Sequence, residues 1–495
     1  MAKTIAQLFE GIECTILGNA EDEITGLAYR SDKVQPGDAF FCIVGLKADG
    51  HSFAQDAINR GAKLIVAERK VYLADATDVT EVLVPDTRKA MAAVAANYHD
   101  HPSRAFDLVG ITGTNGKTTT TYLVEHIANR AGKRTGVIGT VGIVVNGKKE
   151  HADHTTPESP DLQAIFDTMR EAKVDTVAME VSSHALDLLR TWGTTFAVTA
   201  FTNLTQDHLD YHHTFEAYFE AKARLFSKDY PAKRVISVDD KWGKELLRRC
   251  SAADENVISV GWDQTAQIHP VNVDYEPTHT TVELDVRGTR VKFDYPLVGR
   301  FNVSNVMTAF AIGLQLGISQ DGVISALEEA PQVPGRLERI STPHDGGVSV
   351  FVDYAHTPDA LQKALASIQN ITKGRTIVVF GCGGDRDATK RSIMGGISLA
   401  ADYAVVTSDN PRTEDPLAII DDIVSGMAEG EGCFEVQPDR RTAIAAAIAA
   451  AEAGDSILIA GKGHEDYQLV GNEVLSFDDR VVAAEELERA FGEGA

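Results

Sequence analysis

A glycine-rich loop between a buried strand and a helix constrains the fold of this chain more than any other feature. Residues 106–109 are predicted to form a short apolar strand, and apolar side chains recur at helical spacing over residues 122–131 before Gly132 ends the helix. The loop therefore precedes a helix N-terminus, where free backbone N–H groups and the helix dipole favour an anion. Its residues are Gly113, Thr114, Asn115, Gly116, Lys117, Thr118 and Thr119.

The residue types in this loop suit the phosphates of a nucleotide. Gly113 and Gly116 let the backbone pass close to phosphate oxygens, Lys117 supplies a positive charge, and the Thr118 hydroxyl can hold a magnesium ion. The eight-residue Walker pattern is incomplete, because its first glycine would fall at Ile111. The pattern Gly-x-x-Gly-Lys-Thr-Thr between a strand and a helix still predicts nucleotide binding. The alternative is an ordinary glycine-rich turn.

The net charge of the chain narrows its possible partners. The sequence has 495 residues, enough for roughly two to four domains, and its 47 basic and 72 acidic residues give a net charge of −25. Such an acidic chain is a poor partner for nucleic acid or an anionic membrane. An anionic substrate must therefore be bound by locally placed basic groups. The sequence has no run of eighteen apolar residues, so no membrane span is expected.

The cysteines and the N-terminal residues favour a cytoplasmic protein. Five cysteines are scattered without a Cys-x-x-Cys pair, so neither a zinc ribbon nor a disulfide framework is predicted. This usage is typical of a reducing cytosol. Residues 1–10 lack the apolar core of a signal peptide.

The order of predicted strands and helices indicates an α/β protein with three domains. Residues 1–105 form a small α/β module, and residues 106–335 contain the glycine-rich loop followed by alternating strands and helices. Residues 336–495 alternate helices with strands, which predicts a doubly wound, Rossmann-like parallel sheet. The strands of this last segment are expected at residues 348–352, 376–380, 403–407 and 456–459.

Four polar residues of the central segment carry possible chemistry. Glu180 ends an apolar strand, and ligands bind at the carboxyl ends of parallel strands, so Glu180 is expected beside the loop as a second magnesium ligand. The alternative is a solvated acid. His208 and His212 have the spacing of a zinc pair, but no suitable third ligand follows, so zinc is not predicted. Lys222 lies on a predicted amphipathic helix, where a lysine is normally a surface charge.

Four charged or glycine-rich loops follow the four strands predicted in the last segment. Because the carboxyl ends of parallel strands meet at one edge of a sheet, these loops are expected to share one rim and to form a substrate site. They comprise residues 353–356, 381–387, 408–412 and 461–465.

With these motifs in this order, the sequence resembles the Mur ligases nearly from end to end. The family makes peptidoglycan precursors in the cytoplasm, and the motifs are most similar to those of members that add the third residue of the peptide. Besides the glycine-rich loop, the resemblance lies in Met179–His184, Asp207–His212, Phe301–Asn305, Gly335–Glu338, Asp353–Pro358, Gly383–Asp387, Asp409–Arg412 and Gly461–Glu465.

The resemblance implies a ligase that uses ATP and Mg²⁺. ATP would phosphorylate the D-glutamyl carboxylate of UDP-N-acetylmuramoyl-L-alanyl-D-glutamate, and an amine of meso-2,6-diaminopimelate would attack the acyl phosphate. Catalytic roles are implied for Lys117, Glu180, His208 and Lys222, and metal contacts for Thr118, Glu180, His208 and Lys222. Lys222 matches the lysine that family members carry as a carbamate. A monomer that binds these small molecules is expected.

The remaining site residues follow from the family's motifs. The nucleotide would contact residues 113–119 with Asn305, Arg336, Asp353 and His356. The uridine end of the substrate would contact Tyr29, Ser31, Leu46, Lys47 and Ala48. The muramoyl dipeptide would contact Thr155, Thr156, Ser182, Arg190 and Lys222. The diamino acid would contact Arg386, Asp409, Asn410, Pro411, Arg412, Gly461 and Glu465.

The family resemblance also assigns a role to each domain. Residues 1–105 would bind the UDP-sugar, residues 106–335 ATP, and residues 336–495 the amino acid. The last domain should swing toward the central one when ATP binds. The chain departs from the family twice: it has Arg30-Ser31-Asp32 where relatives usually have Asp-Ser-Arg, and His154 where asparagine is common.

The segment Asp409–Arg412 resembles that of ligases that use meso-diaminopimelate. Arg412 offers a planar fork for a distal carboxylate, which lysine lacks, and Glu465 suits an ammonium group. The alternatives are that Arg412 forms a surface ion pair and that L-lysine or another diamino acid is added.

Two other functions compete with this interpretation. A folylpolyglutamate synthase-like ligase shares the core and the acyl-phosphate chemistry, but it lacks the N-terminal module and the Asp-Asn-Pro-Arg loop. A nucleotide-switched binding protein would need only the phosphate loop. Phosphate release that requires both substrates would separate a ligase from such a switch.

Overall fold

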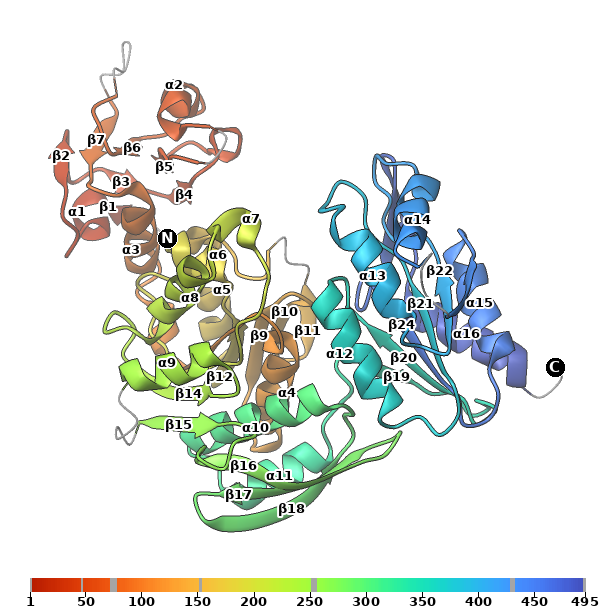
Figure 1. The fold of residues 1–495 in the computed structure, drawn as a ribbon. Coiled ribbons are helices and arrows are strands. Elements are labelled where there is room, and N and C mark those ends of the chain that lie inside the picture. The colour runs from red at the N-terminus through yellow and green to blue at the C-terminus, as the bar shows by residue number, and fades with distance from the viewer. Residues whose placement is uncertain are drawn as a thin grey trace.

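The computed structural model describes residues 2–45, 48–71, 78–150, 154–250, 256–427 and 432–492. Within these ranges the strands form sheets of five, eleven and six strands and two ribbons of two strands each. Figure 1 shows the three large sheets as separate bodies that follow one another along the chain. Every helix in the described part is too short or too polar to cross a bilayer.

The first body is a small α/β sheet. Its elements are β1 (Lys3–Thr4), α1 (Ile5–Leu8), β2 (Thr15–Leu17), β3 (Glu23–Ile24), β4 (Gly26–Ala28), β5 (Asp38–Phe41), α2 (Ala54–Asn59), β6 (Leu64–Ala67), β7 (Thr80–Leu83) and α3 (Thr87–Tyr98). The strand order is β2-β7-β6-β5-β4, with β4 to β7 parallel. Apolar side chains of α1 and α3 cover one face of this sheet, and those of α2 cover the other.

The second body begins with a group of parallel strands. Its elements are β8 (Asp107–Thr112), α4 (Lys117–Arg130), β9 (Thr135–Gly139), β10 (Gly142–Val145), β11 (Lys148–Glu150), α5 (Ser159–Glu171), β12 (Thr176–Glu180), α6 (Ser183–Asp187), β13 (Val198–Phe201), α7 (Leu209–His212), α8 (Phe215–Ala223), β14 (Lys233–Ser237), α9 (Lys241–Cys250), β15 (Val257–Val260), β16 (Ile268–Tyr275), β17 (Thr280–Val286), β18 (Thr289–Tyr295), α10 (Arg300–Gln315) and α11 (Gln320–Glu328). The order is β11-β10-β9-β12-β8-β13-β14-β15-β16-β17-β18.

The strand that precedes the phosphate loop lies near the centre of this sheet and is buried on both faces. The neighbours from β9 to β16 are parallel, whereas β10 with β11 and β17 with β18 are antiparallel extensions at the two ends. Apolar faces of α4, α10 and α11 pack on one side and those of α5, α8 and α9 on the other. The central strands are buried on both faces, as their near-continuous apolar runs predict.

The third body is the doubly wound parallel sheet that the βα alternation predicts. Its elements are β19 (Glu338–Ile340), β20 (Ser349–Asp353), α12 (Pro358–Gln369), β21 (Thr376–Phe380), α13 (Lys390–Ser398), β22 (Tyr403–Val406), α14 (Pro416–Ser425), β23 (Cys433–Val436), α15 (Arg440–Ala450), β24 (Ser456–Ala460), β25 (Tyr467–Val470), β26 (Glu473–Ser476) and α16 (Asp479–Phe491). The order is β19-β20-β24-β21-β22-β23, and only β19 in this described sheet is antiparallel. The helices α12 to α14 cover one face, and α15 and α16 cover the other.

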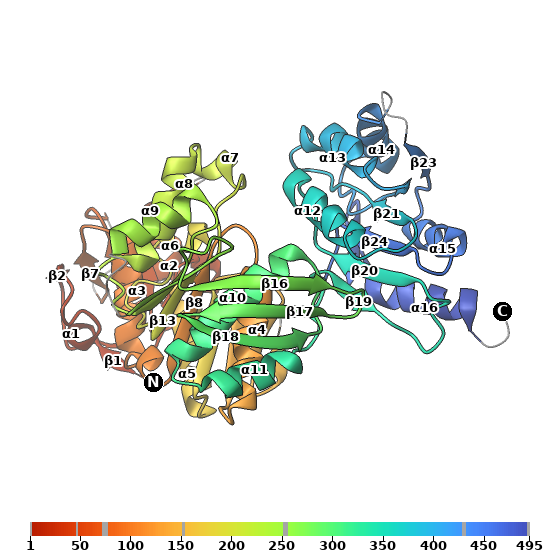
Figure 2. The same ribbon diagram turned by 60° about the horizontal axis from the view of Figure 1, so that its bottom comes forward.

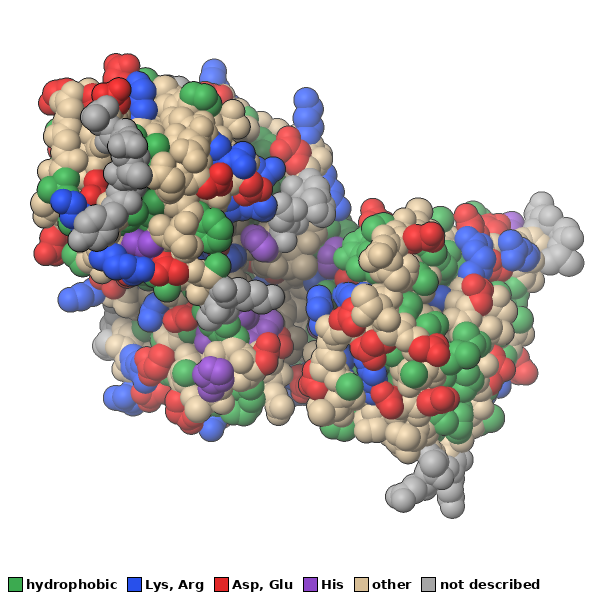
Figure 3. Space-filling model, turned by 90° about the horizontal axis from the view of Figure 1, so that it is seen from above, with side chains coloured by type: hydrophobic (Ala, Val, Ile, Leu, Met, Phe, Trp, Pro, Cys, Tyr) green, Lys and Arg blue, Asp and Glu red, His purple; other side chains and the backbone are tan. Residues whose placement is uncertain are grey.

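The third body lies beside the central one. Figure 2 shows β19 and β20 of the third sheet beside the ends of β16 and β17 of the central sheet. In the space-filling view of Figure 3, a hollow separates the C-terminal body from the rest, and lysine, arginine and histidine side chains lie along it. Basic groups therefore gather locally in a chain whose overall charge is strongly negative.

Candidate active site

The phosphate loop leaves the carboxyl end of β8, between the parallel strands β12 and β13. Gly116 has a φ of +86°, and α4 begins at the next residue without a side chain that caps its first N–H groups. A Cβ at Gly116 would clash with the Asn305 side chain, and one at Gly113 would clash with the Thr202 hydroxyl. Glycine is therefore required at both positions, and the open helix N-terminus is free to bind an anion.

The side chain of Lys117 folds back over the loop. Its Nζ donates hydrogen bonds to the carbonyl oxygens of Gly113 at 3.0 Å and of Thr114 at 2.8 Å. Burial lowers the pKa of Lys117, and the charge of Glu180 opposes this shift. From the β13 side, the Asn203 carbonyl accepts the Thr114 N–H at 2.9 Å. The loop thus holds its cation with backbone oxygens, which phosphate oxygens could replace.

Glu180 lies beside the loop at the end of β12, as predicted. It is only 1% exposed, so the interpretation as a solvated acid is wrong. Its Oε1 accepts the Thr140 N–H at 2.9 Å, and its Oε2 accepts the Thr140 hydroxyl at 3.1 Å. Glu180 is paired in register with Ile111, two residues before Gly113. Together with the Thr118 hydroxyl it offers the oxygen ligands that Mg²⁺ prefers.

Lys222 is not the surface charge that its helix suggests. It is 1% exposed, and its Nζ donates at 2.8 Å to the carbonyl of Gly113, the same oxygen that binds Lys117. The Nζ also lies 4.5 Å from the centre of the Tyr218 ring. Burial, with the charge of Lys117 in second place, lowers the pKa of Lys222 well below its usual value. Its amine is therefore readily neutral, the form that reacts with carbon dioxide.

Histidine rings gather on the far side of the phosphate loop. The ring centre of His184 lies 4.8 Å from that of His208 and 5.5 Å from that of His212. Burial lowers the pKa of His208, and the charges of Lys117 and Lys222 add to this effect. His212 is buried, and its Nε2 lies 2.9 Å from the Ser183 hydroxyl. Among the described residues, no three His, Cys, Asp or Glu side chains are grouped to hold a metal.

Arg336 connects the C-terminal body to the phosphate loop. Its Nη2 donates to the Thr118 hydroxyl at 3.3 Å, and its guanidinium carbon lies 4.8 Å from the centre of the Tyr354 ring. The Asp353 carboxylate accepts the Leu337 N–H at 2.6 Å, and burial raises the pKa of Asp353 to about 6. The structure therefore brings Arg336 and Asp353 toward residues 113–119, where the nucleotide is expected.

Two further residues expected at the nucleotide complete this group. The Asn305 amide donates to the Asn302 side chain at 2.9 Å, directly behind Gly116. His356 follows β20, and its Nδ1 lies 2.8 Å from the Tyr354 carbonyl. Thr119 is buried in the first turn of α4. Asn305 and Thr119 belong to the central body, and His356 belongs to the C-terminal body.

The four loops expected on one rim follow β20, β21, β22 and β24, which are adjacent and parallel, so they do share an edge of the sheet. The Asn410 amide donates to the Glu465 carboxylate at 2.9 Å, and a Cβ at Gly461 would clash with the Asp409 carboxylate. The carbonyl of Pro411 lies against Gly384. The rim is thus a packed set of side chains rather than four independent loops.

The two arginines expected at the diamino acid differ in their surroundings. Arg412 has a φ of +52°, and its Nη1 donates to the Gly384 carbonyl at 2.8 Å. Arg386 is exposed, and its Nη1 donates to the carbonyl of the preceding Asp385 at 3.0 Å. Arg412 is therefore fixed within the rim, whereas Arg386 reaches outward from it.

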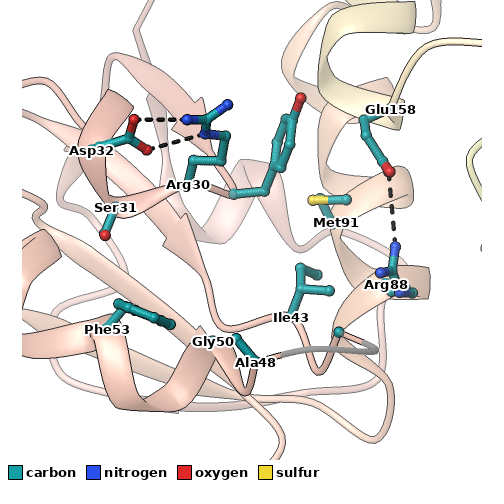
Figure 4. Close-up of a pocket in the computed structure, with 12 residues that line it drawn as sticks. Arg30, Ser31, Asp32, Ile43, Ala48, Gly50, Phe53, Arg88, Met91 and Glu158 are labelled. Atoms are coloured by element: carbon teal, nitrogen blue, oxygen red, sulfur yellow. Dashed lines mark hydrogen bonds and ion pairs between the residues drawn. The ribbon is translucent and has the colours of Figure 1, made fainter. Parts of the chain in front are cut away.

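A cavity of about 340 Å³ lies where the first body meets α5 (Figure 4). Tyr29, Ser31 and Ala48, which are expected at the uridine, line it, while Leu46 and Lys47 lie outside the described residues. In the segment that departs from the family, Arg30 and Asp32 pair with each other at 2.8 Å on the protein surface. The exchanged charges therefore neutralise each other at the cavity wall, as Figure 4 shows.

A chain of polar contacts leads from this cavity to the phosphate loop. Glu158 lines the cavity and pairs with Arg190 at 2.8 Å. The Arg190 guanidinium donates to the Thr156 carbonyl at 2.9 Å. The Thr156 hydroxyl donates to the Glu180 carbonyl at 2.9 Å and accepts the Ser182 N–H at 3.1 Å. Thr155 precedes Thr156 in the chain, and its hydroxyl lies 3.1 Å from that of Thr140. The residues expected at the muramoyl dipeptide therefore form one continuous path.

Sequence motifs alone did not identify three residues of this site. Thr140 and Glu158 stand in loops without a recognised pattern, although Thr140 follows a glycine at the end of a strand. Lys462 is 0% exposed beneath the rim. It lies between two glycines in the motif of residues 461–465, and that motif was the only signal the sequence offered for it.

Comparison with known proteins agrees with this arrangement. Residues 23–103 match the model of the Mur ligase family catalytic domain, residues 111–313 the Mur ligase middle domain, and residues 335–463 the Mur ligase glutamate ligase domain. A protein of Syntrophomonas wolfei is 44% identical over 480 residues, which cover 94% of this chain and 95% of that protein. The chain belongs to the Mur ligase family.

The names of the relatives narrow the comparison. The Syntrophomonas wolfei protein is named UDP-N-acetylmuramoyl-L-alanyl-D-glutamate--2,6-diaminopimelate ligase. A protein of Gloeobacter violaceus with the same name is 44% identical and covers 95% of each chain. A solved structure with this name has a TM-score of 0.72 and 30% identity, and the match covers 99% of both chains. This Mur ligase thus resembles them over nearly its whole length.

The folylpolyglutamate synthase alternative shares the fold but not the whole chain. The Mycobacterium tuberculosis folylpolyglutamate synthase structure in complex with ADP has a TM-score of 0.61 and 22% identity, and the match covers 75% of this chain. At this identity the likeness concerns the fold alone. The Mur ligase relatives, by contrast, match the chain including its first body.

Proposed function

We propose that this Mur ligase uses ATP to join meso-2,6-diaminopimelate to the D-glutamyl carboxylate of UDP-N-acetylmuramoyl-L-alanyl-D-glutamate. One observation carries the proposal: Lys117 and Lys222 both bind the Gly113 carbonyl of the phosphate loop beside Glu180, and Arg336, at the start of the C-terminal body, contacts Thr118 of the same loop. The names of the relatives at 44% identity support the same substrates.

The chemistry divides into two steps. The γ-phosphoryl group of ATP moves to an oxygen of the glutamyl carboxylate, which releases ADP and gives an acyl phosphate. A diamino-acid nitrogen then attacks the acyl carbon, loses a proton and expels inorganic phosphate as the amide bond forms. Both steps need positioning and neutralised charge more than covalent participation by the protein.

The residues around the loop suit this task. Lys117 and the open N-terminus of α4 hold the phosphates, and Arg336 approaches them from the C-terminal side through its contact with Thr118. The Thr118 hydroxyl, Glu180 and His208 would hold Mg²⁺, which supplies charge neutralisation on the phosphates. Lys222 as a carbamate would add an anionic oxygen ligand near the place where its Nζ lies, beside the Gly113 carbonyl.

Each substrate has a separate approach to this point. The uridine end fits the cavity at Tyr29, Ser31 and Ala48, and the dipeptide extends along Arg190 and Thr156 toward Glu180. We assign UDP-sugar binding to residues 1–105, ATP binding to residues 106–335, and amino-acid binding to residues 336–495. We also propose that the enzyme is a monomer of the cytoplasm, and its five free cysteines agree with a reducing compartment.

The choice of diaminopimelate rests on Arg412. Its backbone and its Nη1 are fixed by the rim, so its remaining N–H groups are available for the distal carboxylate of the diamino acid. L-lysine has no carboxylate there and would leave the guanidinium unpaired. Glu465 and Asp409 supply the negative charge that an ammonium group requires.

Phosphate release is the most direct test of this function. The enzyme should release phosphate from ATP only when the UDP-muramoyl dipeptide and diaminopimelate are both present. A nucleotide switch would release phosphate with neither. Lys117→Ala is expected to abolish the release, since it removes the charge at the phosphates.

The split of the site between two bodies predicts closure. Arg336 lies in the connection between the central and the C-terminal body, so the two bodies can approach each other about this segment. Small-angle scattering should show a smaller radius of gyration with the ATP analogue and the dipeptide substrate. An unchanged profile would contradict the proposed closure.

A further inference from the structure

Lys462 is a fully buried cation directly beneath the rim, in the loop that follows β24. Its Nζ donates to the side-chain oxygen of Asn410 at 3.0 Å and to the carbonyl of Tyr467 at 2.7 Å. The carboxylates of Asp409 and Glu465 each lie 3.9 Å from the same nitrogen. One ammonium group therefore faces three residues that are expected to contact the diamino acid.

The contacts of Lys462 continue into a hydrogen-bond chain. Asn410 accepts from Lys462 and from the Leu469 N–H at 2.9 Å through its oxygen, and its amide donates to Glu465 at 2.9 Å. The orientation of the Asn410 amide is thus determined by two donors on one side and one acceptor on the other. This orientation in turn fixes the Glu465 carboxylate.

The hairpin of β25 and β26 completes the support. Tyr467 and Leu469 belong to β25, and the Leu469 carbonyl accepts the Arg412 N–H at 3.0 Å. The Arg412 carbonyl accepts the Gly471 N–H at 2.7 Å. Lys462 therefore joins the loop that carries Arg412 to the hairpin that holds it.

Charge balance gives Lys462 a second role. Burial and the neighbouring Asp409 raise the pKa of Glu465, and the charge of Lys462, the Asn410 hydrogen bond and, less strongly, the charge of Arg412 oppose them. The other charged groups around Lys462 are the buried pair of Arg440 and Asp479. This pair is internally neutralised at 2.7 Å, so Lys462 is the nearer counter-charge for the two rim carboxylates.

We propose that Lys462 is a positioning residue for the diamino acid: it orients Asn410 and Glu465 and balances the Glu465 carboxylate that receives the substrate ammonium. The inference rests on the proposed function and adds a specific source for its amino-acid affinity. Lys462 itself touches neither substrate nor nucleotide. Its effect should therefore be confined to one of the three substrates and should depend on pH.

The test is steady-state kinetics of Lys462→Met, which keeps the length of the side chain and removes its charge and donors. The KM for diaminopimelate should rise at least about tenfold, as expected when a charged, buried donor is lost. The KM values for ATP and the UDP-muramoyl dipeptide should stay within about twofold of the wild type. Lys363→Met, which removes an exposed lysine paired with Asp359 on α12, is the matched control and should change none of them.

The pH profile separates positioning from simple loss of packing. Without Lys462, the pKa of Glu465 rises further, so the acid limb of kcat/KM for diaminopimelate should move to higher pH. Lys462→Arg keeps the positive charge and should return the limb toward its wild-type position. An unmoved limb in Lys462→Met, or an equal rise of all three KM values, would overturn the proposal.

A second variant covers the case in which Lys462→Met does not fold. In Glu465→Gln the group cannot ionise, so its contribution to the acid limb should be lost, and a limb identical in position and slope to that of the wild type would overturn the role of Glu465 and with it that of Lys462. Failure of the proposed function looks different, because the wild-type enzyme would then form no product with diaminopimelate. That result would overturn both inferences.

Discussion

Asp479→Asn should destabilise the C-terminal body much more than removal of an exposed carboxylate does. The guanidinium of Arg440 donates two hydrogen bonds of 2.7 Å to Asp479, and both side chains are 0% exposed. Arg440 also donates to the carbonyls of Ala460 at 3.1 Å and Ser408 at 3.4 Å. Ala460 directly precedes one rim loop, and Ser408 is the first residue of another.

The magnitude follows from burial. Arginine stays charged in proteins, so the variant leaves an uncompensated buried cation, which costs about 3–5 kcal/mol. For a unit of the size of the C-terminal body, each kcal/mol lowers Tm by about 2–4 °C, which gives a decrease of about 6–20 °C. An uncharged pair, Arg440→Met with Asp479→Leu, removes the isolated charge and should recover most of this loss.

Thermal and denaturant unfolding would measure the effect. Asp359→Asn is the matched control in the same body, because it removes an exposed partner of Lys363 and should cost about 0.3–0.5 kcal/mol. Asp479→Asn should also raise the KM for the diamino acid, since the rim loops lose their anchor. If Asp479→Asn melted within 1–2 °C of Asp359→Asn, with about 1 kcal/mol or less between them, the argument from burial would be refuted.

Three further changes should act on single steps of the reaction. Arg412→Ala should lose about 10–150-fold of the preference for diaminopimelate over lysine in kcat/KM, and an intact preference would exclude the guanidinium fork as its source. Burial raises the pKa of Asp353 to about 6, so its carboxylate ionises as pH rises through this value. The KM for ATP should therefore fall between about pH 5 and 7 in the wild type. If the KM still fell in Asp353→Asn, the pH dependence would belong to another group. Removal of dissolved carbon dioxide should lower the kcat of the wild type, and bicarbonate should restore it. The kcat of Lys222→Ala should respond to neither treatment. A wild-type enzyme whose kcat did not depend on carbon dioxide would contradict the carbamate on Lys222.

Local patterns in the sequence were sufficient for the elements around the phosphate loop. The helix predicted over residues 122–131 is present, but α4 begins at Lys117. Its first turns contain four consecutive threonines, which have low helix propensity and conceal the start; in the structure all four are buried against the sheet. The role of Gly116, which comes before Lys117 and these threonines, could be predicted from the sequence, because that role depends only on backbone geometry.

Burial of charged groups could not be predicted in the same way. Lys222 stands between two alanines and Lys462 between two glycines, and their burial depends on Gly113 and Asn410, which are distant in the chain. The hairpin of β25 and β26 was also missed, because its strands are short and their side chains are largely exposed. Contacts between distant segments, rather than local periodicity, determine these features.

Mass spectrometry of the product tests the central claim most directly. The enzyme is incubated with ATP, Mg²⁺, the UDP-muramoyl dipeptide and equal amounts of diaminopimelate and lysine, beside a Lys117→Ala control. We expect the wild type to yield the UDP-muramoyl tripeptide that carries diaminopimelate, with one phosphate released for each amide bond, and the control to yield none. A reaction that consumes ATP without a new amide bond, or a product that carries only lysine, would contradict the account.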